Sequence, residues 1–187
     1  MSLKKIACAV WLTVAILTGT GAFAEDSTLS VKVISEAGAQ RVLAAAEQEA
    51  AKLHAPCAIA VVDRSGILVA FVKMDGVRDG SPDLAIGKAK TSALLQRPSA
   101  ETENNVNNGR VAFVTGGFMA LRGGVPLMVG QEVVGAVGVA GVNKDNDVTI
   151  AEAAAKAFAS LSTGKWTSLL LGRECGSSER QSGLRCA

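Results

Sequence analysis

The chain has 187 residues, a formal net charge of +2 from 19 basic and 17 acidic side chains, one histidine and no tyrosine. This length suits a single domain with a substantial buried core. The nearly balanced charge leaves no basic footprint for nucleic acid. The four cysteines form no CxxC pair, which argues against thiol redox chemistry and zinc ribbons.

The N-terminus has the pattern of a secretory signal. Two lysines precede the apolar run 6–17, and Ala22-Phe23-Ala24 supplies the small residues that a signal peptidase reads. The run is shorter than the roughly 20 residues needed to cross a bilayer, so a membrane anchor is the weaker interpretation. We therefore predict cleavage between Ala24 and Glu25, a periplasmic or secreted protein, and no membrane span in the mature chain.

A helix is expected after an N-terminal segment at 25–35. Ser35 is a suitable N-cap, and apolar residues recur at helical spacing over about 36–53. Pro56 then ends the helix. The short apolar run 57–62 is rich in β-branched residues, which predicts a buried strand.

An antiparallel hairpin and a second helix follow. Residues 63–66, Asp-Arg-Ser-Gly, have the chemistry of a type I turn, so a strand at 67–74 should fold back on the first one. Ser-Pro-Asp opens a helix over about 81–96, with alanines at every fourth position that allow close approach to a sheet. The pattern over 98–124 is weak, and 111–114 fits either a short strand or a buried loop.

The stretch 123–141 holds six glycines and almost no reactive side chains. It predicts strands at 125–129 and 133–140 joined by a two-residue type II′ turn at Gly130-Gln131. In the second strand one face carries bulky side chains, namely Val133, Val137 and Val139, and the other carries Val134, Ala136, Gly138 and Ala140. Glycine inside a strand marks a close approach, and a helix is the favoured neighbour. The GxxGxxG spacing lies within a strand before an acidic loop, so it does not indicate a dinucleotide site.

An alanine-rich helix over about 150–161, ended by Gly164, completes an α+β order built on antiparallel hairpins. The domain thus spans 36–164. A polar tail, 165–187, contains Cys175 and Cys186. These two cysteines either close a small disulfide loop in an oxidising compartment or remain free thiols.

His54 is the sole histidine and the first candidate ligand. Its imidazole could bind a metal ion or a haem iron. The alternative is a histidine placed at a helix C-terminus by the helix dipole. Since the chain has no tyrosine, the other conceivable axial ligands of a haem are a hydroxyl, a lysine and three methionines with an ordinary packing role, Met74, Met119 and Met128.

Four ordered motifs carry a resemblance to a known family. They are AIAVVDRSGILVAFVKMDG at 58–76, AIGKAKTSALL at 85–95, GGVPLMVGQEVVGAVGVAG at 123–141, and the segment 147–154. Together they resemble the haem-binding and haem-degrading family that includes the GlcG and HbpS proteins. One departure is Lys73, which stands where the family pattern has arginine.

The resemblance implies a profilin-like or PAS-like two-layer α+β domain with an antiparallel five-stranded sheet, usually assembled into symmetric homo-oligomers. It also implies that the positions matching the motifs line a cleft for haem or a related tetrapyrrole: Asp75, Lys88, Lys90, Gly123, Gly124 and Pro126. His54 joins this set only on ligand chemistry.

Three functions remain open at this point. The first is an exported haem-binding protein that takes part in haem or iron handling. The second is an enzyme that degrades haem with iron release, although no acid and base pair identifies its catalytic residues. The third is an oligomeric accessory module of small-molecule metabolism that binds no tetrapyrrole.

Overall fold

The computed structural model describes residues 28–163. Residues 1–30 and 31–187 form two separate units, and every helix and strand described here belongs to the second. The predicted signal segment 1–24 and the cysteine-containing tail 165–187 lie outside the described residues, as does the predicted helix stop at Gly164.

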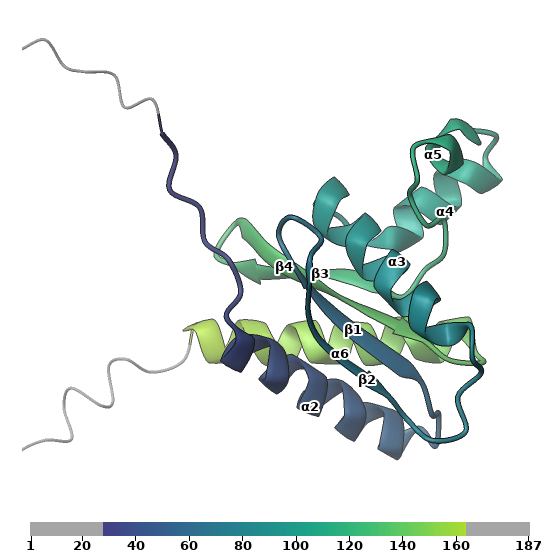
Figure 1. Ribbon diagram of the computed structural model, residues 1–187, viewed down its shortest axis with the longest axis horizontal. Coiled ribbons are helices and arrows are strands. Elements are labelled where there is room, and N and C mark those ends of the chain that lie inside the picture. Colours follow the sequence, from purple (N-terminus) through teal and green to yellow (C-terminus); the bar gives the residue numbers. More distant parts are fainter. Residues whose placement is uncertain (1–27, 164–187) are drawn as a thin grey trace, which may run out of the picture. The chain divides into compact units, whose positions relative to one another are not determined.

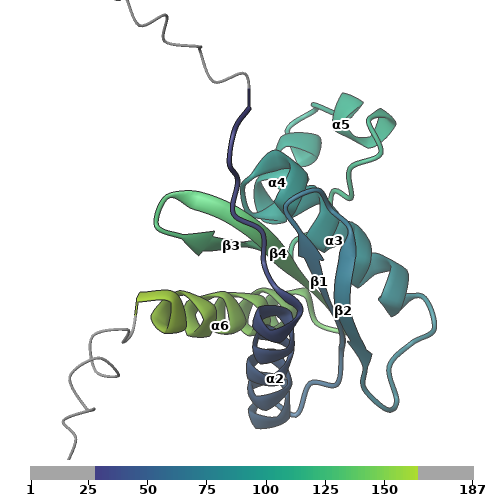
Figure 2. The same cartoon turned by 60° about the vertical axis from the view of Figure 1, so that its left-hand side comes forward.

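The second unit is a four-stranded antiparallel sheet with helices on both faces (Figure 1). The strand order is β2-β1-β4-β3. The helix α3 covers one face, and α2 and α6 cover the other (Figure 2). In chain order the elements are α2 (Glu36–Lys52), β1 (Ala58–Asp63), β2 (Leu68–Lys73), α3 (Ser81–Leu95), α4 (Ser99–Asn107), α5 (Ala112–Thr115), β3 (Gly124–Val129), β4 (Glu132–Ala140) and α6 (Lys144–Thr163).

The α+β class with an antiparallel sheet is confirmed, but the expectation of five strands is wrong. Residues 32–34 run beside the start of β4, yet a single backbone hydrogen bond, Ile34 N to Val134 O at 2.9 Å, joins them instead of a ladder. The segment 111–114, which fitted a short strand, lies largely in the helix α5. None of the helices among residues 28–163 is long and apolar enough to cross a membrane.

Both predicted hairpins are present. In the β1–β2 turn, Gly66 N donates to Asp63 O at 3.0 Å, and the Asp63 carboxylate accepts hydrogen bonds from two backbone amides of the turn. In the β3–β4 hairpin, Val129 pairs with Glu132 across the two-residue loop, and Gly130 has a φ of +66°. A positive φ at the first loop position is what a type II′ turn requires.

The helix ends differ from the sequence pattern mainly at α6. It begins at Lys144, six residues before the predicted start, because Asn143 caps it. The Asn143 side-chain oxygen accepts a hydrogen bond from Asp145 N at 2.9 Å, and Asp147 N donates to Asn143 O at 3.1 Å. The acidic loop expected after the strand at 133–140 therefore contains the first turn of a helix.

The sheet separates two apolar clusters of different bulk. Valines and isoleucines of β1 and β4 pack on α2 and α6, whereas alanines of the same strands pack on α3. A Cβ added to Gly138 would lie 2.6 Å from the backbone nitrogen of Ala89 in α3. Close helix packing therefore explains this glycine. Val134 was expected on the alanine face of β4, but it packs with the valines and isoleucines that face α2 and α6. The reason is a bulge beside Leu127, which shifts the strand register.

Candidate functional site

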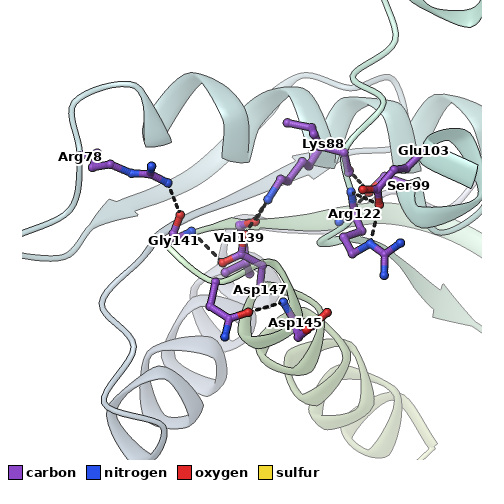
Figure 3. A network of polar contacts seen from close by, with 12 residues as sticks. Arg78, Lys88, Ser99, Glu103, Arg122, Val139, Gly141, Asp145 and Asp147 are labelled. Carbon is purple, nitrogen blue, oxygen red and sulfur yellow. Dashed lines mark hydrogen bonds and ion pairs between the residues drawn. The ribbon is translucent and has the colours of Figure 1, made fainter. Parts of the chain in front are cut away.

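The main polar feature of the domain is a buried ion pair between α3 and α6 (Figure 3). Lys88 Nζ donates to Asp147 Oδ2 at 2.8 Å and to the carbonyl oxygen of Val139 at 2.7 Å. The Lys88 and Asp147 side chains are 5% and 6% exposed. Each charge at this depth needs the other, because a lone buried charge is strongly destabilising.

The ion pair is extended by backbone contacts into a network that joins four segments (Figure 3). The second carboxylate oxygen of Asp147 accepts a hydrogen bond from Gly141 N at 2.7 Å. The carbonyl oxygen of Gly141 accepts one from Arg78 Nη2 at 2.8 Å. The network therefore fixes the backbone that leaves β4 relative to α3, α6 and the loop after β2.

Two glycines make room for the buried lysine. Gly123 has a φ of +109°, and a Cβ there would lie 2.8 Å from Val139 O and 3.2 Å from Lys88 Nζ. A Cβ on Gly124 would lie 2.7 Å from the carbonyl carbon of Lys88. Gly124 N also donates to Ser99 Oγ at 2.9 Å. These glycines are explained by packing around Lys88.

Two hollows flank the short segment Gly141-Val142, at the end of β4. The first has a volume of about 180 Å³ and is lined by His54, Ala55, Pro56, Asn143, Asn146 and the shared residues Gly141, Val142 and Asp147. The second has a volume of about 170 Å³ and is lined by Arg78, Leu84, Lys88, Glu103, Leu121, Arg122, Lys144 and the same three shared residues. We call the surface formed by both hollows the Val142 surface.

The second hollow is positively charged. Its lining contains four basic side chains, Arg78, Lys88, Arg122 and Lys144, against the carboxylates of Glu103 and Asp147. Arg122 forms an ion pair with Glu103, and this hydrogen bond raises the pKa of the Arg122 guanidinium. The excess of positive charge favours a ligand that carries carboxylate groups.

His54 occupies the residue after the C-cap of α2, at the rim of the first hollow. Its φ is +49°, its N donates to Ala51 O at 3.2 Å, and Ala55 N donates to Ala50 O at 3.0 Å. This is the Schellman pattern that ends many helices, in which glycine usually takes the left-handed position. The side chain is exposed. His54 therefore lies at the C-terminus of a helix, as the alternative interpretation expected. This position leaves the imidazole available to bind a ligand.

The structure brings together three of the sequence-predicted site residues and separates three others. Lys88, Gly123 and Gly124 meet in the buried network. Pro126 lies two residues further along the edge strand β3, opposite Ala136. Asp75 is exposed and lines neither hollow, and Lys90 is exposed beside Gly66 at the opposite end of the sheet.

Sequence reasoning missed Asp147 and three of the four basic residues of the second hollow, Arg78, Arg122 and Lys144. The signal for Asp147 was its place in the last matching motif, at the start of a helix. Burial, with smaller contributions from Asp147 and Glu47, raises the pKa of the nearby Cys57 thiol to about 12. Cys57 therefore stays protonated and is no nucleophile at neutral pH. Among residues 28–163, no group of three or more His, Cys, Asp or Glu side chains could hold a metal ion.

Comparison with known proteins identifies the family. The model of the family described as "Haem degrading protein HbpS-like" matches residues 34–156. The chain belongs to the HbpS-like family. This confirms the resemblance carried by the four motifs.

Individual members agree with this assignment. Protein GlcG of Escherichia coli K12 is 40% identical over 108 residues, which cover 57% of this chain and 81% of GlcG. The crystal structure of Klebsiella pneumoniae protein ORFY has a TM-score of 0.67 at 28% identity and covers 71% of this chain and 95% of that one. A double mutant of HbpS from Streptomyces reticuli has a TM-score of 0.65 at 27% identity, covering 70% and 90%.

Proposed function

We propose that the protein binds haem or a related tetrapyrrole on the Val142 surface and takes part in haem or iron handling. Membership of the HbpS-like family supports the ligand class. The proposed location of the ligand rests on the position of the sole histidine. His54 lies at the rim of the first hollow, which adjoins the second, basic hollow.

The residues of the Val142 surface have the chemical properties needed to bind a tetrapyrrole. The His54 imidazole is a suitable ligand for haem iron. Val142 is 82% exposed between the hollows, and Leu84 lies on the basic side, so the ring would meet apolar side chains. Arg78 and Lys144 would receive its carboxylates. When bound, the haem would supply the redox chemistry of the site.

The size of the hollows sets how such a ring would lie. At about 180 and 170 Å³, each is smaller than the roughly 300–1,000 Å³ of enclosed ligand pockets. A flat ligand would therefore lie across Val142 with one face open. A second copy of the chain could cover that face, and we propose that the protein is a homo-oligomer, which light scattering tests directly.

Lys88 and Asp147 act as positioning residues in this proposal. Their ion pair, with the hydrogen bonds to Val139 O and Gly141 N, holds the backbone between the two hollows. Arg78 holds the same backbone from outside through Gly141 O. Substitution of Lys88 is expected to change both hollows without removing a ligand contact.

The first experiment is a hemin titration. We expect a saturable Soret shift with a defined stoichiometry for the wild-type chain. In His54→Gly the imidazole is lost while the left-handed backbone is retained, so the low-spin spectrum should change. A featureless, non-saturating titration of the wild type would remove haem from the proposal. A saturable titration with an unchanged His54→Gly spectrum would move the iron ligand to a methionine or a hydroxyl.

A matched pair of lysine variants tests the basic hollow. Lys144 and Lys90 are both exposed, but only Lys144 lines the hollow. We expect Lys144→Gln to weaken hemin binding and Lys90→Gln to leave it unchanged. Equal affinities for the two variants would exclude this hollow as the carboxylate site.

Oxidative degradation of haem is the second candidate function, because the family description is that of a haem-degrading protein. Product analysis after addition of peroxide or a reductant distinguishes a haem-degrading enzyme from a haem carrier. Iron release over many turnovers supports an enzyme, whereas intact haem supports a carrier.

We also propose that the protein is exported. The support is the signal pattern of the first 24 residues. N-terminal sequencing of the protein from fractionated cells should find Glu25 as the first residue of an extracytoplasmic species. An intact N-terminus in the cytoplasm would contradict export.

A further inference from the structure

A groove lined mainly by apolar side chains lies far from the Val142 surface, between the start of α2, the β3–β4 hairpin and the last turns of α6. Its volume is about 280 Å³. The apolar side chains that line it are Val33, Ile34, Val129, Val134 and Phe158. Val33 is 53% exposed, and Val129 and Phe158 are only half-buried. We call this hollow the α2–α6 groove.

The chain that continues from α6 has the composition to fill this groove. Although the tail is polar from Cys175 onward, residues 165–171 read KWTSLLL and contain one tryptophan and three leucines. A tryptophan side chain buries about 150–250 Å² of surface when it packs. The segment begins two residues after the end of α6 at Thr163.

The distances allow this segment to return to the groove. Phe158 lies five residues before Thr163, which corresponds to about 7.5 Å along a helix axis. Three extended residues beyond Thr163 reach about 10 Å, enough to bring Trp166 back over Phe158. The hairpin and the C-terminal end of α6 lie on the same side of the domain in both views (Figure 1, Figure 2).

We propose that residues 165–171 dock in the α2–α6 groove, with Trp166 buried between Phe158 and Val33. A short tether gives the segment an effective concentration in the millimolar range, which favours it over a second copy of the chain. The docked segment covers the apolar residues of the groove and ties the extended segment before α2 to α6. This proposal is independent of haem binding.

Tryptophan fluorescence tests the proposal directly. The full chain has two tryptophans and no tyrosine, so in a Trp11→Phe background Trp166 is the sole emitter. We expect its emission to be shifted to the blue and protected from acrylamide, relative to the same protein in urea. Val33→Asp should return both readings to those of the unfolded chain.

A matched control is available two residues away. Val31 and Val33 are both 53% exposed, but only Val33 lines the groove, so Val31→Asp should leave the emission unchanged. Val129→Asp provides a second groove variant from a different element, and far-UV circular dichroism checks that each variant is folded.

Three results would overturn the proposal. Native emission equal to that in urea would place Trp166 in water. A protected Trp166 that neither groove variant affects would place the segment elsewhere on the domain. A blue shift that disappears on dilution would identify a second copy of the chain as the occupant.

Discussion

Replacement of Gly138 by alanine tests how closely α3 lies on the sheet. The added Cβ would lie 2.6 Å from Ala89 N and 2.9 Å from Ala89 Cβ, whereas ordinary contact begins at 3.4 Å. It would come still closer to the carbonyl oxygen of Ala85. Because these atoms belong largely to the backbone of a helix, no side-chain rotation relieves the overlap.

The size of the effect follows from this geometry. The helix α3 would have to move outward by about 1 Å, and a gap of that size forfeits up to about half of the dispersion energy of the separated atoms. Overpacked core substitutions typically cost about 1–3 kcal/mol. We expect Gly138→Ala to lower the free energy of unfolding by about 3 kcal/mol, at the upper end of that range.

Urea unfolding followed by circular dichroism measures this free energy. Gly80→Ala is the matched control, because a Cβ there meets nothing within 4 Å and the backbone is already in the right-handed helical region. Gly80 is also the N-cap of α3, where the preference for glycine over alanine opposes the entropic gain, so the control should change by less than about 1 kcal/mol. A loss below about 0.5 kcal/mol for Gly138→Ala, within the usual range of surface substitutions, would refute the close approach of α3.

Three further outcomes are expected from the network and its surroundings. His54→Gly should raise the free energy of unfolding by about 1 kcal/mol, because the left-handed backbone conformation is unfavourable by about this amount for a non-glycine residue. Equal urea midpoints for the variant and the wild type would contradict this expectation. Lys88→Met should cost about 3–5 kcal/mol by leaving the Asp147 carboxylate buried and unpaired, and the added change Asp147→Asn should recover part of the loss. Burial raises the pKa of Cys57 from 9.0 to about 12, so the thiol ionises at a lower pH in the unfolded chain than in the folded one. The free energy of unfolding should therefore fall as pH rises between these two values, by about 1.4 kcal/mol per pH unit. The Cys57→Ala variant should lack this part of the alkaline slope, and parallel slopes for variant and wild type would show that the thiol does not contribute.

Local chemistry predicted much of the fold. Ser35 caps α2 as expected, its Oγ accepting a hydrogen bond from Gly38 N at 3.1 Å. The two hairpins and the close approach at Gly138 also follow from short-range patterns, because turn residues and glycines are constrained by their own neighbours. The four-stranded sheet differs from expectation because the fifth strand came from resemblance and not from any pattern in the residues.

Less of the candidate site than of the fold could be predicted from the sequence. Lys88 and Asp147 are 59 positions apart, and a contact at that separation leaves no periodic signal in either helix. Lys90 and Asp75 matched family motifs as well as Lys88 did, yet only Lys88 is turned inward. For His54 the sequence allowed both a helix-terminal role and a ligand role, and the structure combines the two in one position.

The proline in β3 has a consequence for how the domain behaves in crowded solution. β3 is an edge strand, and Pro126 offers no N–H to a strand arriving from outside. The other edge, β2, contains no proline and exposes Leu68 and Phe71, by 43% and 38%. The two borders of the sheet are therefore unequal, and aggregation by edge-to-edge pairing would start at β2.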